Sequence, residues 1–197
     1  MASLNELMLS YRAFSGVRLN MVIDRDLNTR GQNGSSRDIS NDVDRQLLIH
    51  LRRLADVAIT DVATADVEEY RPSQWVPIQI WSKSGNFRNR VSIQENQAQK
   101  SVELVHSANL EQQIELTKAQ HDHVLLETGP TLSSEIAKLG LIDELCLTVS
   151  AVADIQKAKT LALEFAKCLG LIGFQIVQAI EVNGSSYLVL NRPIGVA

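Results

Sequence analysis

The feature that most constrains the fold is the alternation of short, apolar, β-branched runs with segments of helical periodicity. Three runs, "DVAIT" (56–60), "PIQIW" (77–81) and "HVLLE" (123–127), have the length and composition of buried strands. Apolar residues recur at helical spacing over 41–54, and Ser40 is the expected N-cap of that helix. Strand, helix and strand in alternation predict a largely parallel sheet with helices on its faces.

The remaining elements complete an α/β reading. "VRLNMVI" (17–23) and "ELCLTVSAV" (144–152) suit strands, "SVELV" (101–105) is a weaker strand candidate, and 109–120, 132–139 and 155–170 suit helices, with Gly140 and Gly170 ending the last two. Asn183-Gly184 separates two strand-like runs and predicts a hairpin. We expect a mixed, mostly parallel sheet with an antiparallel C-terminal hairpin, in a single three-layer domain over 1–197.

Composition excludes several function classes. The formal net charge is -4 and basic residues are not clustered, which argues against a nucleic-acid partner. The densest basic stretch contains Arg88 and Arg90, and we interpret it as a solvated loop. No run approaches the ~20 apolar residues of a membrane helix, and the N-terminus lacks the pattern of a signal peptide, so a cytoplasmic protein is expected. His121 and His123 could share a strand face, but no third ligand is identified, so no metal is predicted.

The stretch "HVLLETGPTLSSEIAKLG" (123–140) supports two interpretations. A strand ends at Glu127, a turn contains Gly129 and Pro130, and a helix follows. Open α/β sheets bind ligands at the carboxyl ends of their strands, and the free N–H groups of a helix start suit an anion. An ordinary turn with Pro130 near the first helical position explains the same residues. From this stretch alone, both interpretations stay open.

Three segments in order resemble the reductase domain of riboflavin biosynthesis, whose fold is dihydrofolate-reductase-like. "VRLNMVIDRDLNT" is similar to the strand that usually leads into Ser-Leu-Asp-Gly. "DVAITDVATADVEEYRP" is similar to a strand followed by Gly-x-x-Thr and Tyr-x-Pro. "LLETGPTLSSEIAKLGLIDELCLTVS" is similar to Glu-Gly-Gly-Pro-x-Leu followed by Leu-Val-Asp-Glu-Leu. The match looks closest to the stand-alone bacterial pyrimidine reductases.

The resemblance implies an NADPH-dependent reduction of a ribosylamino-pyrimidine phosphate to its ribityl form, in a homodimer built through the C-terminal strands. It implies catalytic roles for Asp26 and Glu127, and substrate contacts from Asn20, Ser40 and Arg52. The cofactor would be bound by one further set of residues: Asp61, Thr64, Ser82, Lys83, Gly129, Pro130, Thr131 and Leu132.

Four positions depart from the family pattern. Asp24 stands for its Ser, and Leu27, Asp61 and Thr128 stand for glycines. A Cβ makes φ > 0 costly and holds a ligand further from the backbone, and the Asp61 carboxylate would repel a phosphate in a partly desolvated site by about several kcal/mol. These departures motivate a second hypothesis, a catalytically degenerate homologue that binds a nucleotide-like ligand or a protein partner.

Overall fold

The computed structural model describes residues 2–86 and 102–192, which form one eight-stranded sheet in the order β4-β3-β2-β5-β1-β6-β8-β7. Arg88 and Arg90 lie outside the described residues. The elements are α1 (Leu4–Ser10), β1 (Gly16–Ile23), the 3-10 helix η1 (Ser36–Asp38), α2 (Asp42–Arg53), β2 (Val57–Asp61), α3 (Val62–Val67), β3 (Ile78–Ser82), β4 (Val102–His106), α5 (Leu110–Gln120), β5 (His123–Leu126), α6 (Pro130–Lys138), β6 (Glu144–Val149), α7 (Ile155–Leu169), β7 (Gln175–Val182) and β8 (Ser185–Asn191).

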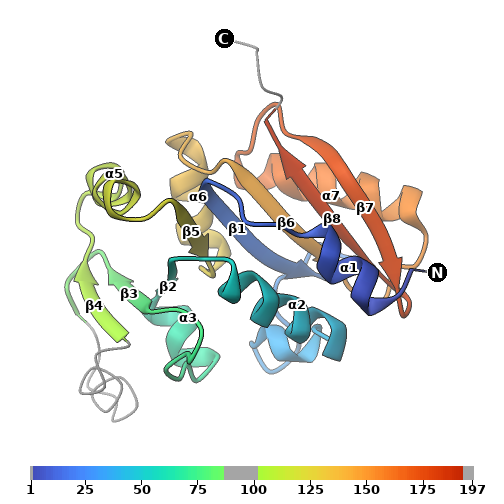
Figure 1. Cartoon of the computed structure of the whole chain (residues 1–197), viewed down its shortest axis with the longest axis horizontal. Helices are drawn as coiled ribbons and strands as arrows, with labels where there is room; N and C mark the ends of the chain where they lie inside the picture. The colour runs from blue at the N-terminus through green and yellow to red at the C-terminus, as the bar shows by residue number, and fades with distance from the viewer. Residues whose placement is uncertain (1, 87–101, 193–197) are drawn as a thin grey trace.

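The sheet is mixed, as predicted. Neighbouring strands from β4 to β6 pair in parallel, whereas β8 pairs antiparallel with both β6 and β7. Asn183 and Gly184 have φ of 50° and 79°, which a two-residue type I′ hairpin turn requires. The strands β4 and β7 therefore form the two edges (Figure 1).

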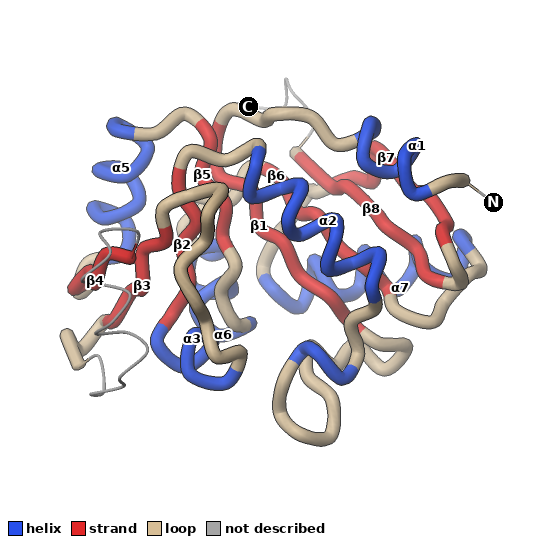
Figure 2. The backbone as a smooth tube through the Cα atoms, turned by 60° about the horizontal axis from the view of Figure 1, so that its bottom comes forward, coloured by secondary structure: helices blue, strands red, loops and turns tan. Residues whose placement is uncertain are grey.

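Helices cover both faces of the sheet and bury a separate apolar cluster on each. Figure 2 shows α1 and α2 in front of the sheet and α7 behind it. Side chains of α1, α2 and α3 pack on one face, and side chains of α5, α6 and α7 pack on the other. In β1 the alternation of side chains sends Leu19 and Met21 to the α7 face, so that Arg18 and Asn20 face α2. The α/β three-layer prediction is confirmed.

The N-cap of α2 is Asn41, so the prediction of Ser40 is wrong by one residue. The Asn41 side chain accepts the backbone N–H of Asp44 at 2.9 Å, which satisfies one of the unpaired donors of the first helical turn. Ser40 instead donates its hydroxyl to the Asp44 carboxylate at 2.6 Å. Ser40 therefore fixes a side chain of the helix, while its neighbour caps the backbone.

Three short elements were not predicted, namely α1, α3 and η1. The α3 helix begins directly after β2, and Asp61 serves as its N-cap. The immediate change from strand to helix at Asp61 brings the next loop over the carboxyl end of β2. The chain leaves β1 with α2 on one face of the sheet, and it leaves β5 with α6 on the other. Ligands of open α/β sheets bind where such connections diverge.

Candidate functional site

Two cavities adjoin at the carboxyl ends of the parallel strands. Cavity 1 has a volume of about 620 Å³ and lies on the α2 side, between β1, α2 and the loop after α3. Cavity 2 has a volume of about 890 Å³ and lies over the ends of β2, β3 and β4 beside α6. Thr29, Arg30, Gly129 and Pro130 line both cavities. Two molecules bound here would meet across the turn at Gly129, which is the turn that the sequence singled out.

Glu127 and Arg52 form a two-pronged ion pair in the wall of cavity 1. Arg52 donates from Nε to Oε1 at 2.7 Å and from Nη2 to Oε2 at 2.5 Å, and the Tyr70 hydroxyl also donates to Oε2. The Glu127 side chain is 4% exposed and that of Arg52 is 18% exposed. Burial raises the pKa of Tyr70, and the adjacent Glu127 raises it further, so the phenol remains a neutral donor. Burial works to lower the pKa of Arg52, but the Glu127 carboxylate outweighs it and the pKa is raised.

This pairing limits what Glu127 and Arg52 can do for a ligand. An ionised carboxylate accepts at about four lone-pair positions, and here Oε2 receives two hydrogen bonds and Oε1 receives one. Glu127 can therefore accept one further N–H at Oε1. Arg52 was expected to contact the substrate, but two of its N–H donors are committed to Glu127, and its guanidinium lies 5.3 Å from the Tyr70 ring centroid. The main role of this ion pair is therefore to hold the two side chains in fixed positions in the wall of cavity 1.

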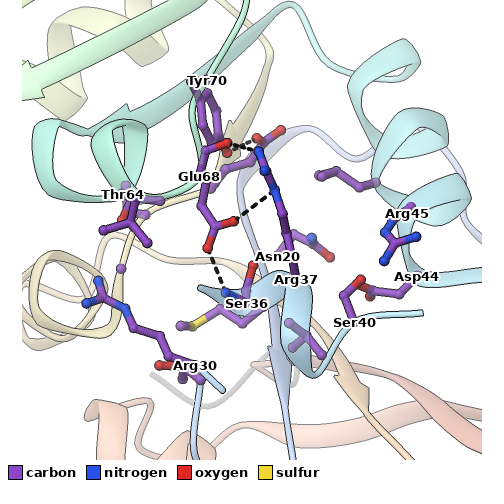
Figure 3. A pocket seen from close by; sticks show the side chains of 18 of the residues that line it. Asn20, Arg30, Ser36, Arg37, Ser40, Asp44, Arg45, Thr64, Glu68 and Tyr70 are labelled. Atoms are coloured by element: carbon purple, nitrogen blue, oxygen red, sulfur yellow. Dashed lines mark hydrogen bonds and ion pairs between the residues drawn. The ribbon is translucent and has the colours of Figure 1, made fainter. Parts of the chain in front are cut away.

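Asn20 supplies the clearest polar group without a partner in cavity 1. Its Oδ1 atom is buried and has no hydrogen-bond partner among the described residues. Figure 3 shows Asn20 between Glu68 on one side and Ser40, Asp44 and Arg45 on the other. Because buried polar atoms in proteins are nearly always hydrogen-bonded, an orphan atom in a cavity wall is a candidate contact for a ligand or a water.

Asp44 forms a polar floor beside Asn20. Its Oδ2 atom accepts the hydroxyl of Ser40, and its Oδ1 atom accepts the hydroxyl of Thr148 at 2.6 Å. Burial raises the pKa of Asp44, although these two hydrogen bonds act against the shift. Ser40 is thus brought to cavity 1 as expected, with its hydroxyl hydrogen committed to Asp44.

Asp61 occupies the backbone donors at the boundary between the cavities. Its Oδ1 atom accepts the N–H of Thr64 at 2.9 Å, and its Oδ2 atom accepts both the Thr64 hydroxyl and the N–H of Gly129, each at 2.8 Å. Thr64, expected at the cofactor, lines cavity 1. A Cβ added to Gly129 would lie 3.0 Å from the Thr64 hydroxyl oxygen, so this close approach favours glycine. The turn is therefore held by a carboxylate of the chain itself.

The far end of cavity 2 contains Ser82, Lys83 and Ser107. Ser82 is buried and donates to the Asn86 carbonyl at 3.0 Å, while Lys83 forms an ion pair of 2.7 Å with Glu135 of α6. Ser107 is 1% exposed, and its hydroxyl has no partner among the described residues. Like Asn20 in cavity 1, Ser107 therefore has a buried polar atom without a hydrogen-bond partner among the described residues. The apolar residues Leu27, Trp81, Leu132 and Phe165 also line this cavity.

The structure does not bring Asp26 together with the other predicted site residues. Asp26 is exposed and lines neither cavity, because Asp24 folds the loop back on itself by accepting the backbone N–H groups of Asp26 and Asn28 at 2.8 and 2.9 Å. The other predicted residues divide between the cavities. Asn20, Ser40, Arg52, Thr64 and Glu127 line the first, Asp61, Ser82, Lys83, Thr131 and Leu132 line the second, and Gly129 and Pro130 line both.

The positions that replace family glycines behave differently from one another. Leu27 has φ of 65°, so a branched side chain occupies a conformation that suits glycine. Asp61 has φ of -97° and Thr128 is not among the positive-φ residues, so the expected cost of positive φ does not apply to them. Thr128 is buried, and its hydroxyl lies 2.7 Å from that of Ser133.

For several lining residues the sequence did not reveal the contacts that they make. Tyr70 stands in the Tyr-x-Pro motif, but only the fold shows that its hydroxyl reaches Glu127. Ser107 follows the weakest of the predicted strands. Arg30 lies in the long loop after β1, and its Nη2 atom would lie 3.5 Å from a Cβ at Gly129.

The described part of the chain contains no group of three or more potential metal ligands. His123 is bound to Asp56 through Nδ1 at 3.0 Å, so one of the two histidines considered for a metal has a local partner. Among the described residues, no helix is long and apolar enough to cross a membrane.

The fold is dihydrofolate-reductase-like. A pyrimidine reductase-like protein from Corynebacterium diphtheriae superposes with a TM-score of 0.67 at 17% identity, covering 96% of this chain and 98% of that one. A riboflavin biosynthesis reductase from Saccharomyces cerevisiae gives 0.66 at 11% identity, covering 96% and 99%. A dihydrofolate reductase from Enterococcus faecalis, complexed with NADP(H), gives 0.54 at 10% identity, covering 90% and 96%.

Comparison by sequence gives no match, either to a family model or to a curated protein. At these identities the structural likeness establishes the fold. It agrees with the family that the three sequence motifs resemble.

Proposed function

We propose that the protein is a reductase of the riboflavin-biosynthesis type, which converts a ribosylamino-pyrimidine phosphate to its ribitylamino form. The observation that carries the proposal is the pair of adjoining cavities with a common wall at Gly129 and Pro130. A bimolecular reduction needs a donor and an acceptor side by side, and the two cavities provide that arrangement. The fold shared with pyrimidine and riboflavin reductases supports the same assignment.

Cavity 1 is the proposed substrate site. Oε1 of Glu127 can accept one pyrimidine N–H, and the orphan Oδ1 of Asn20 can accept a second N–H or a sugar hydroxyl. Arg45 and Arg30, both in the cavity wall, are the guanidinium groups we assign to the substrate phosphate, since Arg52 is committed to Glu127. In this proposal Arg52 is a positioning residue that fixes the Glu127 carboxylate.

Cavity 2 is the proposed donor site, and NADPH is the donor that the resemblance implies. The apolar wall at Leu27 and Trp81 suits a flat ring, and the orphan Ser107 hydroxyl suits a polar group of the ligand. The diphosphate does not fit the residues as they stand. The Asp61 carboxylate already accepts the Gly129 N–H at 2.8 Å, so a second anion there would meet a like charge.

The assignment is tested by following oxidation of the cofactor with the purified protein and the ribosylamino-pyrimidine phosphate. We expect formation of a product with two additional hydrogens, identified by mass spectrometry, and a KM for the pyrimidine phosphate that rises on the order of tenfold in Asn20→Ala. The matched control is Asp154→Asn, at the N-cap of α7 outside both cavities. If the wild-type protein forms no product at about 1 mM of each ligand, the upper end of ordinary KM values, the reductase proposal is wrong.

A second candidate is a degenerate homologue that binds a nucleotide-like ligand without reducing it. The occupation of the Gly129 N–H by Asp61 favours this candidate. It predicts that the pyrimidine phosphate binds to cavity 1, seen by calorimetry, while no product forms with any nicotinamide cofactor.

The homodimer implied by the resemblance is also a proposal. The strand β7 is an edge of the sheet, and Val177 on it is 58% exposed. Unpaired edges and exposed apolar side chains suit a contact between copies. Analytical ultracentrifugation of the wild type and Val177→Lys tests it, with a shift to monomer expected in the variant.

A further inference from the structure

The charged side chains around cavity 2 disfavour a bound anion at the boundary with cavity 1. Asp61, Asp66 and Glu135 contribute carboxylates to the wall, and Arg30 and Lys83 contribute cations. Lys83 forms an ion pair with Glu135 at 2.7 Å. Among the described residues of this wall, the exposed Arg30 is then the cation that has no ion pair. The described part of the wall of cavity 2 therefore has no surplus of positive charge with which to hold two phosphates.

The Asp61 carboxylate fills the position that an anion would take. It receives three hydrogen bonds, from the N–H and the hydroxyl of Thr64 and from the N–H of Gly129, which immediately precedes α6. Backbone N–H groups at such a turn are the donors that nucleotide-binding proteins offer to phosphate. Here the donor at Gly129 is satisfied internally, and the α6 N-terminus has a negative charge beside it.

A ligand is nonetheless indicated in the same cavity. The Ser107 hydroxyl is buried in its wall and has no partner among the described residues, and the cavity volume of about 890 Å³ is in the range of small-molecule sites. The cavity thus combines a polar group that lacks a partner at one end with an anion that is already in place at the other.

We propose that Asp61 determines the specificity of cavity 2: its carboxylate is a built-in anion that disfavours the diphosphate of a dinucleotide and favours a nucleoside-like ligand without charge at this point. The proposal rests on cavity 2 being the donor site of the proposed function. It predicts that a nicotinamide compound without a diphosphate binds at least as well as NADPH.

The experiment compares three ligands by calorimetry at low salt: inorganic pyrophosphate, NADPH and reduced nicotinamide riboside. Asp61→Asn removes the charge and retains an N-cap for α3, and Asp61→Gly removes the side chain altogether. Asp154→Asn is the matched control, because Asp154 also caps a helix, but outside both cavities. Circular dichroism establishes that each variant is folded.

We expect pyrophosphate and NADPH to bind Asp61→Asn and Asp61→Gly on the order of tenfold more tightly than the wild type, because a like charge is removed. Reduced nicotinamide riboside should bind all four proteins equally, within about twofold, and Asp154→Asn should match the wild type for every ligand. Equal affinity of wild type and both Asp61 variants for pyrophosphate and NADPH, including no binding by any of them, would overturn the proposal.

The two proposals fail separately. If pyrophosphate binds the Asp61 variants and not the wild type, while no protein forms the reduced pyrimidine, the role of Asp61 stands and the reductase assignment is lost. If the wild type reduces the pyrimidine with NADPH and neither Asp61 substitution lowers KM for the cofactor, the reductase assignment stands and the role of Asp61 is refuted.

Discussion

Arg52 and Glu127, 75 residues apart in the chain, are joined by two N–H···O bonds of 2.7 and 2.5 Å between α2 and the end of β5. The bidentate geometry fixes both side chains, and the Tyr70 hydroxyl holds the second carboxylate oxygen. The carboxylate that the sequence assigns to the ligand is therefore also the link between a helix and the sheet.

The first prediction concerns this ion pair. Arg52→Ala leaves an almost fully buried carboxylate without its cation, so we expect a loss of about 3 kcal/mol in the free energy of unfolding, measured with urea. Arg45→Ala is the control, since its partner Asp42 is 87% exposed and the pair should contribute about 0.5 kcal/mol or less. Similar losses in both variants would contradict the buried role of Arg52.

The second prediction separates binding from stability at Asn20. Its buried Oδ1 has no partner in the described part of the chain, so Asn20→Ala removes an unsatisfied group and should leave the free energy of unfolding within about 0.5 kcal/mol of the wild type. Affinity for the pyrimidine phosphate should fall on the order of tenfold, the value of one lost hydrogen bond. A large loss of stability with unchanged affinity would show that Asn20 is structural.

The third prediction uses the positive φ of Leu27. At an ordinary position Ala is more stable than Gly by about 0.5–1 kcal/mol. At φ of 65° the order should reverse, with Leu27→Gly more stable than Leu27→Ala by about 1 kcal/mol, because both lose the side chain and only Gly relieves the strain. Thermal melts of the two variants measure the difference, and the ordinary order would show that no strain is present.

The fourth prediction concerns Thr128, which replaces a family glycine. Thr128→Gly should not tighten a ligand in cavity 2, since the side chain is buried against Ser133 and does not line that cavity. It should cost about 1–2 kcal/mol of stability through the lost hydroxyl contact and the added chain freedom. Thr128→Ser keeps the hydroxyl and is the control. The free energy of unfolding of both variants is measured by chemical denaturation, and an equal loss in the two would contradict the role of the hydroxyl contact.

The fifth prediction is a pH dependence from Asp44. Its ordinary pKa is 3.8, and burial raises the pKa in the folded protein. The folded state therefore holds a proton where the unfolded state has lost it, and stability falls as the pH rises from that ordinary value through the raised pKa. Asp44→Asn removes this fall, so the stability of the variant relative to the wild type should grow with pH in that window.

Urea titrations from about pH 4 to about pH 7 measure the effect. Asp42→Asn, at an exposed position on the same helix, is the control and should follow the wild type. A constant difference between Asp44→Asn and the wild type over this range would contradict the prediction.

The sequence alone determined most of the elements and the mixed character of the sheet, parallel inside with an antiparallel hairpin at the C-terminal end. β-Branched runs and helical spacing report burial over a few neighbouring residues, and Asn183-Gly184 reports a turn that depends on backbone conformation alone. The motifs after β1, β2 and β5 indicated which strand ends carry the site. These signals depend on residues that are close together in the sequence, so the sequence alone is enough to detect them.

Only the tertiary structure decided what each side chain is bound to. The sequence placed Asp61 near an expected phosphate, but its bond to the Gly129 N–H, 68 residues away, depends on β2 and β5 being neighbours in the sheet. The same holds for Arg52 with Glu127, and for Ser107, whose lack of a partner among the described residues is visible only in the folded structure. Hydrogen bonds and ion pairs form between groups a few ångströms apart in space, and the separation of two residues along the chain does not show whether they are that close.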